Sequence, residues 1–176
     1  MTEPINADDI ATFGSAFPDR KTSYHDDTDI DIFIRFLDKI HNGEKTFKPK
    51  PHGIYGIDLG MFDSDKNLEI GFDIERWTAW NTEWPKNYRY VSFLSRKDKF
   101  LNQDYDFGMV HFNYDRTKFL ITTKTNILKY PPMDRHTKGK SDRVRKVEFG
   151  CAMLVGSNLT DRERTLFSNH YDTSIN

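Results

Sequence analysis

The sequence predicts an α+β fold in which a helix precedes a mixed, mainly antiparallel central sheet. Three observations lead to this expectation. Apolar residues recur at helical spacing over residues 28–42, apolar and polar residues alternate over 68–76, and further strand-like segments follow with little helix between them. A helix followed by successive strands is typical of α+β proteins rather than of alternating βαβ units.

Length and composition suit one folded domain with an N-terminal arm. The chain has 176 residues, with 26 Lys plus Arg against 27 Asp plus Glu, and aromatic residues make up 14%. Residues 1–25 lack strong periodicity and are expected to form an irregular N-terminal arm or a short helix, while residues 26–176 are expected to form a single domain. The net charge of -1 argues against a wholly basic nucleic-acid binder but allows a local basic face.

Several features favour an intracellular, cytoplasmic protein that does not enter a membrane. No stretch approaches ~18 consecutive apolar residues, the length that a spanning helix needs. The N-terminal residues lack the basic start and apolar run of a secretory signal. One cysteine, Cys151, excludes an intramolecular disulfide and a cysteine-cluster zinc site. A small, charge-balanced domain of this kind would also fit a viral protein in a host cell.

The first expected element is a helix from Thr28 to Asn42. Thr28 can cap it, with Asp31 three residues on in the manner of a capping box. The Asn42-Gly43 pair supplies the stop. One apolar stripe follows the helix, formed by Ile30, Phe33, Ile34, Leu37 and Ile40.

Strands and turns follow the helix. Residues 45–52, with two prolines, read as a loop, and residues 53–62 read as a strand. The acidic and polar residues 63–67 favour a turn. Residues 68–76 alternate with period two, which indicates a half-buried strand. The remaining expected elements are a tryptophan-bearing loop at 77–86, a strand at 88–95, a short helix at 96–103, a hairpin of strands 107–114 and 118–125 around 115–117, a long loop through 130–146, a strand at 147–155 and a short helix at 160–170.

Three carboxylates on the first two expected strands form the most informative pattern. Asp58 lies within one apolar strand, and Asp73 and Glu75 lie on the polar face of the next. If these strands pair through the 63–67 turn, the carboxylates can converge, and Mg²⁺ or Mn²⁺ would relieve their repulsion. The alternative interpretation is a strand that is simply solvated on its polar side.

The segments Ile57-Asp58-Leu59 and Phe72-Asp73-Ile74-Glu75, preceded by a helix and followed by a third strand, resemble the PD-(D/E)XK, or restriction-endonuclease-like, nuclease superfamily. The resemblance covers about residues 28–125 and rests on a short, degenerate motif. It implies a restriction-endonuclease-like fold and metal-dependent hydrolysis of phosphodiester bonds.

The resemblance assigns candidate roles residue by residue. Asp58 would be the first metal ligand and Asp73 the second. Glu75 stands where the family usually has a lysine, and it would be a further metal ligand or a water-orienting base. Lys97, just after the expected third strand, is the nearest substitute for the missing lysine, and Arg96 beside it would contact phosphate.

A basic stretch near the C-terminus is the candidate nucleic-acid contact. Cations of this kind can follow a phosphate backbone, although such a run is often a solvated loop. The tryptophans Trp77, Trp80 and Trp84 can either stack on bases or pack into the core. The basic candidates are Arg135, Lys138, Lys140, Arg143, Arg145 and Lys146.

Two functions from different classes remain open at this point. The first is a metal-dependent nuclease whose partner is nucleic acid, with DNA as the expected form. The second is a non-catalytic module that binds protein or nucleic acid, a reading that Glu75 in the lysine position favours. The sequence also leaves open whether the chain acts alone, as a homodimer or as a subunit of a larger viral assembly.

Overall fold

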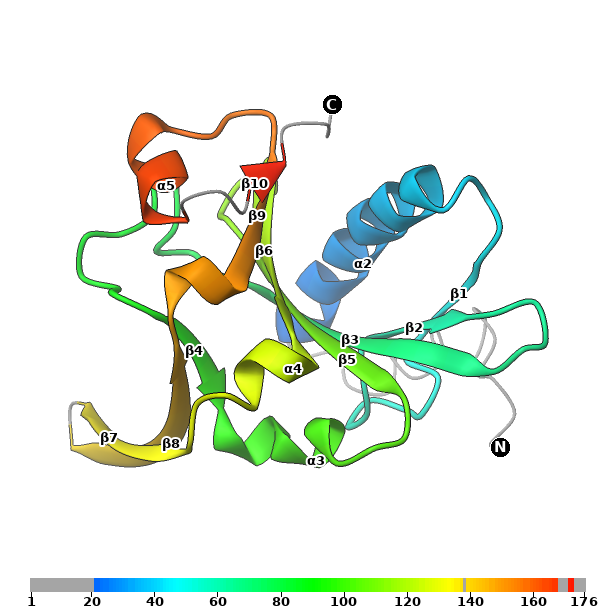
Figure 1. Cartoon of the computed structure of the whole chain (residues 1–176), viewed down its shortest axis with the longest axis horizontal. Helices are drawn as coiled ribbons and strands as arrows, with labels where there is room; N and C mark the ends of the chain where they lie inside the picture. Colours follow the sequence, from blue (N-terminus) through cyan, green and yellow to red (C-terminus); the bar gives the residue numbers. More distant parts are fainter. Residues whose placement is uncertain (1–20, 138, 168–170, 173–176) are drawn as a thin grey trace. The chain divides into compact units, whose positions relative to one another are not determined.

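The computed structural model describes residues 21–137, 139–167 and 171–172 (Figure 1). The fold class is α+β, as the sequence predicts, with mostly antiparallel strands and a few helices. Of the described residues, those up to Arg76 belong to one compact unit, and those from Trp77 onward belong to another. Residues 1–20 of the expected arm lie outside the described residues, while residues 21–25 are helical.

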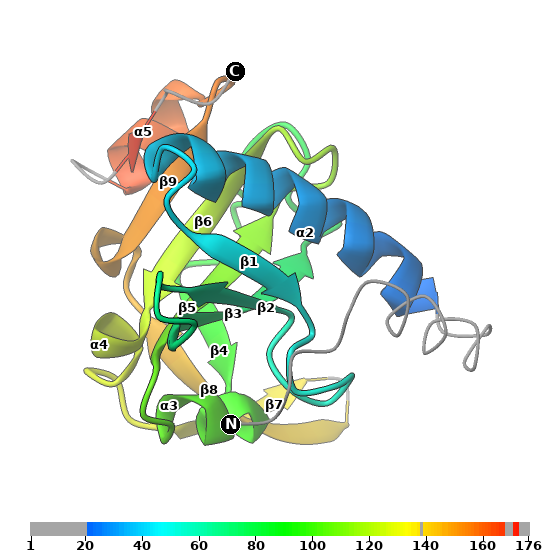
Figure 2. The same cartoon turned by 90° about the vertical axis from the view of Figure 1, so that its right-hand side faces the viewer.

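The first unit contains one helix and three strands. The helix α2 (Lys21–Ile40) precedes β1 (Thr46–Pro49), β2 (Leu59–Phe62) and β3 (Leu68–Arg76). The strands pair in the order β1-β2-β3, and both pairings are antiparallel. Helix α2 crosses one face of these strands (Figure 2).

Helix α2 packs through the predicted stripe but starts earlier than predicted. Ile30, Phe33 and Leu37 are buried, and the Phe33 ring meets the Phe72 ring of β3 edge-on at 4.9 Å between centroids. Thr28 lies inside the helix, so the prediction that it caps the helix is wrong.

The end of α2 follows the sequence signal. Asn42 and Gly43 both adopt positive φ, at 52° and 73°, which is the left-handed conformation that stops helices. The Gly43 N–H donates to the Asp38 carbonyl over 3.1 Å. Ile40, the last member of the predicted stripe, is exposed because the helix ends there.

Strand β3 has the predicted bounds, and the turn before it is also confirmed. The Asn67 N–H donates to the Asp63 carboxylate over 2.9 Å and closes the turn. The strand expected over 53–62 is shorter, because residues 51–57 turn and only Leu59–Phe62 pair. The expected 45–52 loop contains strand β1, which tolerates Pro49 because it lies at the edge of these strands.

The second unit contains two sheets. In one, β5 (Asp106–Phe112), β6 (Lys118–Thr123), β9 (Ala152–Gly156) and β10 (Tyr171–Asp172) pair in that order. The β5–β6 hairpin is the predicted one, and β10 pairs with β9 in parallel. The predicted last strand starts later than expected, because Phe149–Cys151 forms a 3-10 turn before β9.

The second sheet corrects the prediction of a long loop over 130–146. Strand β4 (Val91–Leu94) pairs with β8 (Lys140–Val147), and β8 pairs with β7 (Met133–Thr137). Val144 and Val147 are completely buried and anchor β8. The strand expected at 88–95 is therefore a four-residue member of this small sheet.

Short helices complete the second unit. They are the 3-10 turn η1 (Ser95–Lys97), α3 (Asp98–Leu101), α4 (Lys124–Ile127) and α5 (Asp161–Leu166). Helix α5 has a full capping box, in which Thr160 and Glu163 bond each other's backbone N–H. Among the described residues, no helix is both long enough and apolar enough to cross a membrane.

Candidate nucleic-acid interface

Asp58 lies just before β2 and brackets Asp73 of β3. The Asp58 N–H donates to the Phe72 carbonyl over 2.8 Å, and the Asp58 carboxylate accepts from the Ile74 N–H over 2.7 Å. Because the register pairs Leu59 with Phe72, the two aspartates hold neighbouring positions on adjacent strands. One Asp58 carboxylate oxygen therefore has a structural role, because it accepts a hydrogen bond from the backbone of β3 in the place of a backbone carbonyl.

The other two candidate ligands share one face of β3. Asp73 and Glu75 alternate with Phe72 and Ile74, and Asp73 is buried while Glu75 is half-buried. Within the described ranges, no three His, Cys, Asp or Glu side chains form a group that could hold a metal ion. The metal site expected from Asp58, Asp73 and Glu75 together therefore stays a prediction. A Mg²⁺ ion held by one or two carboxylates takes its other ligands from water and substrate phosphates, and that form stays a prediction.

Lys97 and Arg96 lie in the second unit, on the 3-10 turn that follows β4. Arg96 is exposed and Lys97 is half-buried. The three carboxylates belong to the first unit. The assignment of Lys97 to the same catalytic centre therefore stays a prediction that came from the resemblance.

The basic candidates lie on the β7–β8 hairpin and not on a loop. Arg135 of β7 pairs with Asp142 of β8 at 3.3 Å, and Arg143 of β8 pairs with Asp134 of β7 at 3.5 Å. Lys140 opens β8, and Lys138 lies outside the described residues. The cations thus line a two-stranded ribbon whose acids lie across from its arginines.

Arg145 differs from its neighbours on the hairpin. Its guanidinium bonds both carboxylate oxygens of Asp98 at 3.1 Å and also donates to the Tyr130 carbonyl over 2.7 Å. Its side chain is only 12% exposed. A bidentate, largely buried arginine of this kind ties β8 to α3, and we assign it no contact with nucleic acid.

Two tyrosines just before β4, of which Tyr90 contacts Lys146 of the hairpin, are functional candidates that the sequence reasoning missed. The Lys146 ammonium lies 4.9 Å from the centre of the Tyr90 ring, which is a cation–π distance. Tyr88 is 43% exposed, and its ring packs on Trp77 at 5.6 Å. The signal in the sequence is the Tyr88-Arg89-Tyr90 alternation, which lies within the strand expected at 88–95.

Two of the three tryptophans pack into the core, as one of the two interpretations predicts. Trp80 and Trp84 are completely buried and pack edge-on at 5.2 Å, so both are core residues. Trp77 is half-buried, and its ring lies 4.4 Å from that of His111. His111 is fully buried, in keeping with its place in β5.

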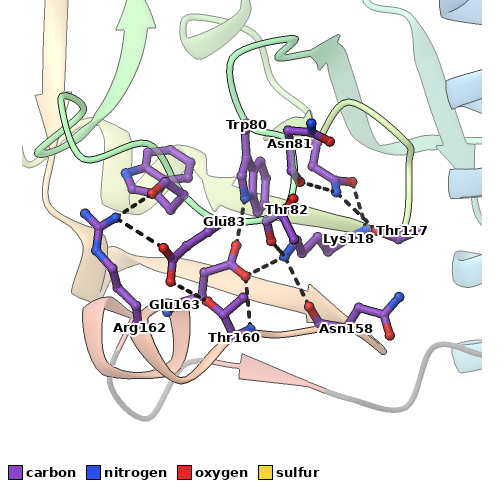
Figure 3. A network of polar contacts seen from close by, with 12 residues as sticks. Trp80, Asn81, Thr82, Glu83, Thr117, Lys118, Asn158, Thr160, Arg162 and Glu163 are labelled. Carbon is purple, nitrogen blue, oxygen red and sulfur yellow. Dashed lines mark hydrogen bonds and ion pairs between the residues drawn. The ribbon is translucent and has the colours of Figure 1, made fainter.

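A buried polar cluster joins α5 to β6 and to the tryptophan-bearing loop (Figure 3). The Lys118 ammonium donates to the Glu163 carboxylate at 2.5 Å, to the Thr82 carbonyl at 2.5 Å and to the Asn158 carbonyl at 3.1 Å. Glu163 also accepts from the Trp80 indole N–H over 2.7 Å. Both charged side chains are almost sealed from solvent, at 2% and 0% exposed.

This cluster resembles an active site in composition but not in bonding. The three N–H donors of Lys118 have three acceptors. Both oxygens of Glu163 are also engaged, because Oε1 accepts from Lys118 and the Thr160 N–H while Oε2 accepts from the Trp80 indole. A catalytic lysine or glutamate needs a free donor or acceptor for its substrate. We therefore interpret the pair as a structural clamp on α5.

Cys151 is half-buried and lies beside a tyrosine. The Tyr130 hydroxyl lies 3.4 Å from its sulfur. This contact, helped by burial, raises the pKa of Tyr130 to about 12. The tyrosine is therefore neutral across the physiological range and is no general base.

Comparison with known proteins adds no assignment to this geometry. No family model matches the chain, and neither the curated proteins nor the solved structures contain a match. The restriction-endonuclease-like resemblance therefore stays a prediction, and the functional conclusion depends on the geometry alone.

Proposed function

We propose that this protein binds nucleic acid through the β7–β8 hairpin and that binding does not require catalysis. The observation that carries the proposal is the arrangement of the basic stretch as an antiparallel ribbon (Met133–Thr137 with Lys140–Val147). A ribbon holds the cations of each face in a fixed row, with Arg135 and Lys146 on one face and Arg143 on the other, whereas a loop does not. Nucleic-acid backbones present phosphates in a row of the same kind, and phosphate contacts supply most of the non-specific affinity.

The charge of the hairpin supports an anionic partner. Residues 134–146 contain six basic and two acidic residues. The ion pairs Arg135–Asp142 and Arg143–Asp134 are solvent-exposed, with the second at 63% and 73% exposure. Exposed pairs contribute only about 0–1 kcal/mol, so phosphate oxygens can replace these carboxylates at little cost.

The binding test is a salt titration of a fluorescein-labelled oligonucleotide followed by fluorescence anisotropy. We expect Arg135→Gln, Arg143→Gln and Lys146→Gln each to weaken binding and to reduce the slope of log Kd against log salt by about one phosphate contact. Lys86→Gln, which removes an exposed lysine outside the hairpin, is the matched control and should leave the slope unchanged.

Substitution of the two acidic residues of the hairpin should change the binding affinity in the opposite direction. Asp134→Asn and Asp142→Asn release Arg143 and Arg135 from their partners, so both variants should bind more tightly than the wild type. The proposal fails if the wild-type protein does not bind, or if the arginine and aspartate variants bind as the wild type does.

The predicted metal-dependent nuclease is the second candidate. The observation that favours it is the bracketing of Asp73 by Asp58, which sets two carboxylates at neighbouring positions of β2 and β3. Such a pair can hold Mg²⁺ or Mn²⁺ once nucleic-acid phosphates complete the ligand set. Chemistry at this pair would be added to the binding function and would not replace it.

Plasmid cleavage with Mg²⁺ or Mn²⁺ tests this candidate. We expect activity in the wild type, and none in Asp58→Ala or Asp73→Ala, with Asp65→Ala as the control because Asp65 is an exposed turn residue of the same unit. Cleavage that survives in Asp58→Ala, or its absence from the wild type, removes the nuclease and leaves the binding proposal intact.

A further inference from the structure

The segment just before β4 presents an exposed aromatic residue whose ring packs on two indoles. Tyr88 is 43% exposed. Its ring packs against Trp77 at 5.6 Å and against Trp84 at 6.5 Å, and Trp84 is completely buried. The two indoles therefore fix the tyrosine ring in place while much of the residue meets water, so stacking a ligand on it costs little side-chain entropy.

A second aromatic ring lies two residues along and touches the hairpin itself. Tyr90 is half-buried, and the Lys146 ammonium of β8 lies 4.9 Å from its ring centre. The register places Lys146 opposite Ser92 of β4, one alternation beyond Tyr90. Arg89, between the two tyrosines, is exposed. Aromatic and basic residues therefore alternate in the segment Tyr88-Arg89-Tyr90 just before β4, and Lys146 lies over the second ring.

This alternation matches one class of ligand. Base faces stack on aromatic side chains while cations beside them meet the phosphates, and this combination is typical of proteins that bind single strands. Bases in a duplex already stack on one another, so only unstacked bases can stack on a tyrosine ring. A protein partner would use the apolar faces but would not need the row of cations.

We propose that Tyr88 and Tyr90 form a stacking site for single-stranded nucleic acid, with Arg89 and Lys146 contacting its phosphates. The inference deepens the proposed function and rests on it, because it names the strand state of the partner and adds two aromatic residues to the cations of the hairpin. The site selects unpaired nucleotides but reads no particular sequence, since every base offers a face for stacking.

The test compares fluorescein-labelled oligo-dT of 15 nucleotides with a 15-base-pair duplex, by anisotropy. We expect the wild type to prefer the single strand. Tyr88→Leu and Tyr90→Leu keep apolar bulk but lose the ring, and each should raise the Kd for oligo-dT about fivefold to a hundredfold while changing the Kd for the duplex little. Tyr114→Leu is the matched control, because Tyr114 is a 51% exposed tyrosine of the same unit.

The outcomes separate this inference from the proposed function. If the wild type binds neither oligonucleotide, both fail. If it binds with the expected salt dependence but prefers the duplex, or if the two leucine variants bind oligo-dT as the wild type does, only the stacking site fails. Should a leucine variant not fold, photo-crosslinking of the wild type to bromodeoxyuridine-containing oligo-dT decides. Crosslinks on Tyr88 or Tyr90 support the site, and crosslinks confined to other residues overturn it.

Discussion

Lys118 and Glu163 form an ion pair at 2.5 Å whose two side chains are 2% and 0% exposed. Charges removed from water in this way are costly unless every donor and acceptor has a partner. Here the carbonyls of Thr82 and Asn158 and the indole of Trp80 complete the set. The pair thereby specifies where α5 docks, because a shift of that helix would leave a buried charge without its partner.

The first prediction concerns this pair. Glu163→Gln should lower the free energy of unfolding by about 3–5 kcal/mol, because it leaves the Lys118 charge buried without an opposite charge. Urea denaturation followed by tryptophan fluorescence measures the loss. Asp134→Asn, which opens an exposed pair with Arg143, should change the same quantity by at most about 0.5 kcal/mol.

A double variant checks the physical reason. Lys118→Met combined with Glu163→Gln no longer buries an uncompensated charge, so its loss should be smaller than the sum of the two single losses. Additive losses would contradict the clamp.

The second prediction concerns Gly156, which faces Lys118 across the β6–β9 pairing. A Cβ at this position would lie 2.5 Å from the Lys118 Cβ and 2.8 Å from the Thr117 carbonyl oxygen, and the backbone carbonyl cannot swing aside. Gly156→Ala should therefore cost about 1–3 kcal/mol of stability. Gly150→Ala is the control, because a Cβ at Gly150 meets nothing within 4 Å. Equal unfolding midpoints for the two variants would refute the steric argument.

The third prediction concerns the bidentate contact between Arg145 and Asp98. Asp98→Asn keeps the shape but removes the charge that faces the guanidinium, so it should lower stability by about 1–2 kcal/mol. Asp142→Asn removes the charge from an exposed pair with Arg135 and should be nearly neutral. Thermal unfolding compares the two substitutions, and a larger loss in Asp142→Asn would contradict a structural role for Arg145.

The fourth prediction concerns the turn between β5 and β6. The Thr117 hydroxyl donates to the Asp115 carboxylate over 2.7 Å, and the Thr117 N–H and the Asn113 amide donate to it as well. These hydrogen bonds stabilise the charged form more than burial disfavours it, so the pKa of Asp115 lies below its ordinary value of 3.8. Thr117→Val should raise that pKa, as measured by carboxyl NMR titration. Thr125→Val, at an exposed position of α4, should leave it unchanged.

The sign of the pH dependence follows from the lowered pKa. A carboxyl whose pKa is lower in the folded state contributes stability above the unfolded pKa, and loses it as the pH falls through the folded value. The stability difference between the wild type and Thr117→Val should therefore be largest near neutral pH and should narrow below pH 3.8. A difference that widens in acid would contradict this assignment.

The elements that the sequence predicted well are those that local signals specify. Strand β3 has its expected bounds because two local patterns specify it. Apolar and polar residues alternate along its nine residues, and the turn that precedes it is closed between Asp63 and Asn67. The end of α2 follows from Asn42 and Gly43. Contacts distant in sequence decided the rest. Strand β8 forms because Val144 and Val147 pair with β4, which lies far earlier in the sequence, and become buried. The many charged residues of β8 give it no clear apolar alternation from which a strand could be predicted.

The candidate site shows the same division. The sequence identifies which residues of the hairpin are basic. It does not reveal that Arg145 forms a bidentate contact with Asp98, 47 residues away. The Lys118–Glu163 pair spans 45 residues and has no local signature beyond the capping box of Thr160. Tyr90 is a candidate for contact with nucleic acid because β4 pairs with β8, which brings Lys146 to its ring, and no local pattern predicts that pairing.

All three tryptophans of the chain lie between residues 77 and 84, within the second unit. Tryptophan emission, excited selectively at wavelengths that tyrosine does not absorb, is therefore an optical reporter of that unit alone, whereas helix α2 contributes strongly to the far-ultraviolet dichroism of the first. Following both signals through one denaturation curve, without any label, would reveal whether the two halves of the chain melt as one cooperative body or in separate steps.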